Sequence, residues 1–90
     1  MIQYEIKVTG RVQGVWYRKF AEEKANELGI KGWVKNTVDG GVLLLVQGEE
    51  IELETFIDWL RIGPPLARVN KITKAKMNLL SNFDNFTIQY

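Results

Sequence analysis

Cysteine and histidine are both absent from the 90 residues of this chain. The chain therefore cannot form disulfide bonds, a thiolate nucleophile or an imidazole base, and a zinc site would lack its two commonest ligand types. A catalytic triad that depends on histidine is excluded. Any catalysis must rely on positioning and fixed charge, supplied by arginine, lysine, asparagine, carboxylates, hydroxyls and backbone amides.

Long apolar runs and a strong excess of one charge are also lacking. No segment approaches the roughly 18 apolar residues that a membrane-spanning helix needs. The first five residues lack the basic and then apolar order of a secretory signal, so we expect a cytoplasmic protein. The formal net charge of +1 argues against the broad basic surface of a nucleic-acid-binding protein. The length and the 46% hydrophobic content predict a single domain with one core over residues 1–90.

The apolar pattern predicts two helices and several strands. Apolar and polar residues alternate over residues 2–9, as in a half-buried strand. Apolar residues recur at helical spacing over 17–28 and again over 50–62. The remaining segments are predicted as strands at 30–38, 42–47, 67–76 and 86–90, with a loop at 78–85.

The order of these elements is β-α-β-β-α-β with a short strand added at the C-terminal end. Asp39 and Gly40 predict a two-residue hairpin turn between the second and third strands. Two βαβ crossovers joined by a hairpin predict an α+β, ferredoxin-like, two-layer sandwich. In this fold both helices cover one face of an antiparallel sheet.

The segment from Gly10 to Arg18 joins the first predicted strand to the first predicted helix through Gly10 and Gly14. Backbone N–H groups in a tight glycine-containing turn can converge on one point, and the start of a helix adds free donors and a partial positive charge. Arg18 adds a planar guanidinium. The segment therefore predicts an anion-binding site, for which phosphate is the natural ligand.

A second segment, from Gly32 to Gly40, lies on the next predicted strand and its hairpin. In a ferredoxin-like sheet, the strands that carry the two segments run parallel with one strand between them. Spacing alone does not decide whether their functional residues meet.

The segment from Gly10 to Arg18 resembles the first signature of the acylphosphatase family, Gly-x-Val-Gln-Gly-Val followed by an aromatic residue and then the arginine. The residues from Gly32 to Asn36, followed by Gly40, Val42 and Gly48, resemble the second signature at the expected intervals. Two long motifs in the right order are far more specific than a lone glycine pattern. The resemblance covers nearly the whole chain.

The resemblance implies that the chain hydrolyses acyl phosphates to a carboxylate and inorganic phosphate. Arg18 would bind the phosphoryl oxygens, and Asn36 would hold the attacking water. The phosphate-binding backbone amides would come from Gln13, Gly14, Val15, Trp16, Tyr17 and Arg18. No metal or organic cofactor is implied. We expect a monomer whose partners are the acyl phosphate and the phosphate product, with no nucleic acid and no membrane.

The absence of histidine is compatible with this chemistry. The leaving group is a carboxylate, whose conjugate acid has a pKa of about 4, so it needs no general acid at neutral pH. The Asn36 amide is too weakly basic to remove a proton, but its carbonyl oxygen can accept a hydrogen bond from water. We therefore expect Asn36 to position the water and the substrate's own phosphoryl oxygen to take the proton.

Simpler interpretations exist for the same residues. Arg18 could have no role beyond pairing with Glu22 on an exposed helix face, an interaction worth roughly 0.2–0.5 kcal/mol. Asn36 could serve simply as a turn or strand-end residue. Thr37 is left outside the catalytic set, because β-branched residues occur in strands for packing reasons alone. Three aromatic residues either line an entrance for the acyl group or pack in the core. They are Trp16, Tyr17 and Trp33.

The predicted strand from Val42 to Val46 is apolar on both faces. Leu43 and Leu45, together with Trp33, form either a self-association patch or a surface covered by the last strand and its loop, and we favour the second interpretation. An RNA-binding sheet of the same topology is an alternative function, but this strand lacks the basic, glycine and aromatic residues that stack bases. A non-catalytic anion-binding domain is a further alternative, against which the presence of both Arg18 and Asn36 argues.

Overall fold

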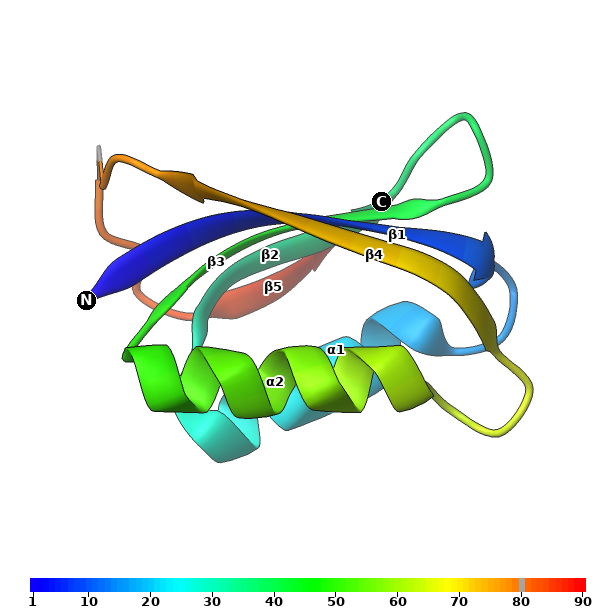
Figure 1. The fold of residues 1–90 in the computed structure, drawn as a ribbon, viewed down its shortest axis with the longest axis horizontal. Helices are drawn as coiled ribbons and strands as arrows, with labels where there is room; N and C mark the ends of the chain where they lie inside the picture. Colours follow the sequence, from blue (N-terminus) through cyan, green and yellow to red (C-terminus); the bar gives the residue numbers. More distant parts are fainter. Residues whose placement is uncertain (80) are drawn as a thin grey trace.

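The computed structural model describes residues 1–79 and 81–90. In this part of the chain, five strands form one sheet, and two helices lie side by side against one face of it (Figure 1). The elements are β1 (Ile2–Arg11), α1 (Tyr17–Leu28), β2 (Lys31–Asn36), β3 (Val42–Gly48), α2 (Glu50–Ile62), β4 (Arg68–Met77) and β5 (Phe86–Gln89). The predicted order of elements is confirmed. The predicted loop at 78–85 includes residue 80, which lies outside the described residues.

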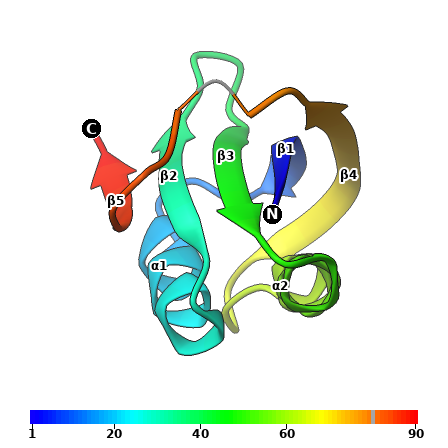
Figure 2. The same ribbon diagram turned by 90° about the vertical axis from the view of Figure 1, so that its left-hand side faces the viewer.

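The strand order is β4-β1-β3-β2-β5. The first four strands pair antiparallel, as the ferredoxin-like fold requires. β5 pairs parallel with β2, so the complete sheet is mixed and not purely antiparallel as expected. The reason is that β4 ends and β5 begins at the same end of the sheet, where Gln3 pairs with Met77 and Gly32 pairs with Phe86. β5 therefore leaves this end in the direction of β2, on the opposite edge from β4 (Figure 2).

The connection between β2 and β3 is longer than the predicted two-residue turn, because β2 ends at Asn36. The Thr37 amide donates to the Gly41 carbonyl at 3.0 Å, and the Gly40 amide donates to the Thr37 carbonyl at 3.2 Å. The Asp39 carboxylate accepts from the Gly41 amide at 3.2 Å, an interaction two residues along the chain that is typical of aspartate in turns. We call residues 37–41 the β2–β3 hairpin loop.

The hydrophobic core lies between the helices and the sheet. Each helix turns a narrow apolar face inward, with Ala21 and Ala25 on α1 and Leu53 and Phe56 on α2. The sheet contributes alternating residues that are buried beneath the helices: Tyr4, Ile6, Val8, Val34, Val42, Leu44 and Val46. This core fixes the start of α1 over the end of the sheet where β1 and β2 reach their last residues. Among the described residues, no helix is long and apolar enough to cross a membrane.

The other face of the sheet is partly covered. The side chain of Gln47, only 1% exposed, donates to the Ser81 carbonyl and accepts from the Phe83 amide at 3.0 Å. These bonds attach Ser81 and Phe83 to one end of this face. β5 pairs along the edge of β2 within the sheet, so the last strand does not lie over Leu43 and Leu45 as we favoured. Leu43 and Leu45 are half-buried. Self-association through them stays an untested hypothesis.

Candidate functional site

The loop between β1 and α1 has an unusual backbone. Gly10 has a φ of 128° and lies where the pairing of β1 with β4 changes register, and Gly14 has a φ of 73°. A side chain at Gly10 would place a Cβ only 2.2 Å from the Arg68 carbonyl oxygen. Trp16, the residue before α1, has a φ of 67°, which is uncommon and strained for a bulky residue. Strain of this kind is frequent at functional sites.

The amides of this loop are available to a ligand. The first amide of α1 that donates to a preceding residue is Phe20, which bonds the Trp16 carbonyl at 3.0 Å. Across the described parts of the chain, the backbone amides from Gln13 to Lys19 donate to no other backbone group. Free amides at the start of a helix, together with the helix dipole, favour an anion.

Arg18 lies in the first turn of α1 and reaches across to the end of β5. Its Nη1 donates to the Gln89 carbonyl at 3.1 Å, and its Cζ lies 4.8 Å from the centre of the Tyr90 ring. Glu22 accepts from Lys19 at 3.0 Å instead. The interpretation of Arg18 as a partner of Glu22 is therefore wrong, and the guanidinium faces the pocket.

Asn36 is the last residue of β2 and pairs with Val42, which in turn pairs with Val8 of β1. These paired residues place Asn36 at the same end of the sheet as the start of the β1–α1 loop. The Oδ1 atom of Asn36 is buried and has no hydrogen-bond partner among the described residues. The Asn36 carboxamide can therefore accept a hydrogen bond without giving up an existing one.

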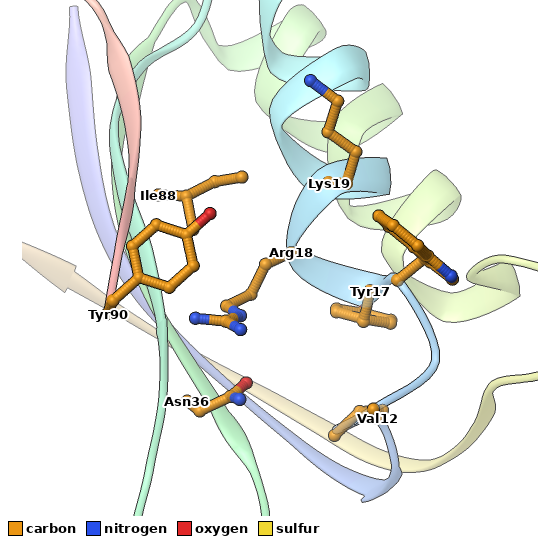
Figure 3. A pocket seen from close by; sticks show the side chains of 9 residues that line it. Val12, Tyr17, Arg18, Lys19, Asn36, Ile88 and Tyr90 are labelled. Carbon is orange, nitrogen blue, oxygen red and sulfur yellow. The ribbon is translucent and has the colours of Figure 1, made fainter.

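Arg18 and Asn36 line one pocket of about 430 Å³, and their side chains point toward one another within it (Figure 3). The structure thus brings the two motifs together. The full lining is Val12, Gly14, Trp16, Tyr17, Arg18, Lys19, Asn36, Ile88 and Tyr90.

Four pocket residues were not predicted as site residues. Val12 and Lys19 flank the predicted amides in the sequence, whereas Ile88 and Tyr90 come from β5 and the residue after it. The latter two enter because β5 pairs with β2 so that Ile88 lies opposite Val34 and Gln89 opposite Lys35. The sequence predicted a short last strand at residues 86–90, but the residues of a strand do not show which other strand it pairs with.

The three aromatic residues that were predicted either to line the pocket entrance or to pack in the core lie in different environments. Tyr17 is 1% exposed, and its hydroxyl donates to the Leu60 carbonyl at 2.6 Å, which joins the start of α1 to the end of α2. Burial raises the pKa of Tyr17 well above its ordinary value. Trp16 is 78% exposed at the rim of the pocket. Trp33 is half-buried on the sheet and does not line the pocket.

Polar contacts also hold the β2–β3 hairpin loop in place. The ammonium group of Lys7 lies 3.0 Å from the Asp39 carboxylate and 3.1 Å from the Thr37 hydroxyl, which itself donates to Asp39. The Thr37 hydroxyl first, and then Lys7, lower the pKa of Asp39 to about 2. Thr37 thus orients the hairpin loop and does not contact the Asn36 amide by a hydrogen bond.

No group of three or more acidic side chains within residues 1–79 and 81–90 is arranged to hold a metal ion. The donors that the pocket offers include amides, a guanidinium, an ammonium group and a carboxamide, which are groups that recognise a phosphoryl oxygen or a water molecule.

The model of the acylphosphatase family matches residues 4–88. The chain belongs to the acylphosphatase family. An acylphosphatase of Archaeoglobus fulgidus is 44% identical over 90 residues, with 100% of each chain covered. One of Methylococcus capsulatus is 43% identical over 88 residues, which span 98% of this chain and 96% of the relative. The crystal structure of acylphosphatase from Bacillus subtilis has a TM-score of 0.97 and 39% identity over the full length of both chains.

These findings confirm the resemblance carried by the two sequence motifs. They also confirm the ferredoxin-like α+β fold and the enzyme class, a hydrolase of acyl phosphates.

Proposed function

We propose that the pocket between the β1–α1 loop and the end of β2 hydrolyses acyl phosphates to a carboxylate and inorganic phosphate. Arg18 and the amides from Gln13 to Arg18 bind the phosphoryl group, and Asn36 holds the attacking water. One observation carries the assignment: Arg18 and Asn36, which come from separate motifs, line the same pocket beside a run of free amides.

The phosphoryl group meets fixed positive potential in this arrangement. Arg18 has five N–H donors, and the Gln89 carbonyl uses one of them, so the others remain for phosphoryl oxygens. The Tyr90 ring lies against the guanidinium and restricts its orientation. Because these donors are already in place, they stabilise the charge on the equatorial oxygens of the transition state without reorganising.

Water is the nucleophile, and Asn36 sets its position. The unpartnered Oδ1 of Asn36 accepts one hydrogen bond from the water, which directs an oxygen lone pair toward phosphorus. As the P–O bond to the carboxylate breaks, the carboxylate departs without needing a proton. The proton of the water passes to a phosphoryl oxygen. Alignment and electrostatic stabilisation thus supply the catalysis, with no side chain acting as a base.

We further propose that the chain acts as a single-domain monomer in the cytoplasm, with the acyl phosphate as its only partner besides the phosphate product. Every residue given a role above comes from one chain, so the site does not require a second copy. The chain contains no cysteine, so its folding does not depend on an oxidising compartment.

The direct test is hydrolysis of benzoyl phosphate by the purified protein in the presence of a chelator, comparing wild type with Arg18→Ala. Loss of two charge-assisted hydrogen bonds in the transition state is worth roughly 3–6 kcal/mol, so turnover should fall by about 10²-fold or more. Arg61→Ala is the matched control, because Arg61 is an exposed arginine on α2 outside this pocket.

The Arg61→Ala variant should keep the wild-type rate. Unchanged turnover in Arg18→Ala would remove Arg18 from the mechanism. Activity that disappears when the chelator is added would contradict a reaction run by side chains and amides alone.

A further inference from the structure

The side chain of Gln13 joins the two halves of the site. Its Nε2 donates to the Thr37 carbonyl at 2.7 Å and to the Gly41 carbonyl at 2.8 Å. Both acceptors belong to the β2–β3 hairpin loop, and Thr37 directly follows Asn36. The backbone of Gln13 belongs to the phosphate-binding loop, so one residue contacts both motifs.

Both hydrogens of the Gln13 amide are used. The same two carbonyls already accept within the hairpin loop, from the Gly40 amide at 3.2 Å and from the Thr37 amide at 3.0 Å. A carbonyl oxygen has two lone pairs, so Gln13 fills the second acceptor position of each. Since both partners are acceptors, the orientation of the amide is determined by the network: the NH₂ group must face the hairpin loop.

The sheet does not supply an equivalent link. β1 and β2 are separated by β3, so no ladder of backbone hydrogen bonds connects the strand that precedes the phosphate-binding loop with the strand that carries Asn36. Within the described part of the chain, the two bonds of Gln13 are the hydrogen bonds that join residues 12–16 to residues 37–41. The sheet and Lys7 of β1 hold the hairpin loop near β1, and Gln13 adds the direct link between the phosphate-binding loop and the backbone next to Asn36.

We infer that Gln13 is a positioning residue that holds the phosphate-binding loop and Asn36 at a fixed separation, an inference that rests on the proposed hydrolysis. Phosphate binding needs only the loop and Arg18, whereas attack needs the water at Asn36 to be in line with the bound phosphoryl group. A misplacement of about 1 Å can cost up to about 10²-fold in rate. Loss of the Gln13 link should consequently reduce kcat far more than it weakens phosphate binding.

The test uses Gln13→Met, which keeps the length of the side chain without its donors, and Gln13→Glu, which keeps its shape and places a carboxylate against two carbonyls. Benzoyl phosphate is the substrate, and inorganic phosphate as competitive inhibitor reports on the loop. We expect kcat to fall by roughly 10-fold to 10²-fold in both variants, with an inhibition constant for phosphate that changes by less than about 3-fold. The activity of Gln13→Glu should recover partly as the pH falls toward about 4, because its protonated form regains one donor.

Gln47→Met is the matched control. Gln47 makes a comparable set of hydrogen bonds, but it lies five residues along β3 from Val42, about 17 Å from the Asn36 end of the sheet. This variant should lower the Tm and leave kcat unchanged at temperatures where it is folded. A purely structural role for Gln13 would give the same result as Gln47→Met and would overturn the inference.

The outcomes separate the two proposals. A wild-type protein without turnover would refute the proposed function itself, whereas an active wild type with an unchanged kcat in Gln13→Met would refute only the role of Gln13. Should the variants not fold, NMR of the wild type decides. The side-chain NH₂ of Gln13 should exchange with solvent more slowly than that of the exposed Gln89, and phosphate should shift the amide signals of Thr37 and Gly41. Equal exchange rates, or unshifted signals, would overturn the inference.

Discussion

Replacing Asn36 by alanine should separate activity from stability. The Oδ1 atom of Asn36 accepts no hydrogen bond from the described residues, so alanine breaks no such bond within the folded chain. The packing contacts that alanine loses border the pocket. We therefore expect the free energy of unfolding of Asn36→Ala to stay within about 1 kcal/mol of the wild-type value. For a chain of this size, each kcal/mol corresponds to roughly 4–8 °C in Tm.

The catalytic effect of the same change should be large. Loss of the acceptor that orients the water should reduce kcat by roughly 10²-fold to 10³-fold, the range seen when one preorganised hydrogen-bonding group is removed from an active site. The KM should change little, because Arg18 and the loop amides bind the phosphoryl group. The assay pairs initial rates of benzoyl phosphate hydrolysis with thermal unfolding followed by circular dichroism, at a rate-assay temperature well below Tm.

The matched control is Asn26→Ala, since Asn26 is an exposed asparagine on α1 that does not line the pocket. It should keep both the wild-type kcat and a Tm at or above the wild-type value. A Tm of Asn36→Ala that falls by many degrees, with a loss of activity explained by the unfolded fraction, would show that Asn36 is structural. An unchanged kcat would remove Asn36 from the reaction.

Two further predictions concern the loops around the site. Gly10→Ala should lower the free energy of unfolding by more than about 2 kcal/mol in urea titrations, since its Cβ would meet the Arg68 carbonyl oxygen at 2.2 Å. Gly29→Ala, whose Cβ would meet no atom within 4 Å, should lower it by only about 1 kcal/mol. Equal losses in the two variants would contradict the steric argument. The pKa of Asp39 is about 2 in the folded chain, below its ordinary value, so the unfolded chain binds more protons between about pH 4 and pH 2. The stabilisation from Asp39 is therefore complete above about pH 4 and is lost as the pH falls toward 2. Asp39→Asn should lose less stability than wild type over this interval, and parallel stability curves would refute the shift.

Local sequence patterns predicted most of the elements, because the period of the apolar residues reflects which face of each strand or helix is buried. They also predicted an anion-binding segment that ends at Arg18, whereas the role of Asn36 was predicted only from the resemblance to the second family motif. Gly10 and Gly14 are required by backbone geometry at their own positions, and the chemistry of Arg18 and Asn36 is recognisable wherever they lie. The family motifs added the expectation that they act together.

The lengths of loops and the direction of the last strand were predicted less well. The Asp39-Gly40 pair suggested a two-residue turn, but the carboxylate of Asp39 bonds the Gly41 amide, and Gln13 and Lys7 hold the hairpin loop open in its longer form. The contacts of Gln13 and Lys7 join residues more than twenty positions apart, so they leave no mark on the local pattern.

The sequence by itself determined the order of elements and carried the two family motifs that contain Arg18 and Asn36, since each of these depends on neighbours within a few positions. Only the tertiary structure decided that β5 lies parallel beside β2, which brings Gln89 and Tyr90 against an arginine 71 residues or more earlier in the chain. It also decided that Gln13 bonds the loop next to Asn36. Such pairings depend on where the chain returns in space, because hydrogen bonds between distant segments form only after the core has placed those segments side by side.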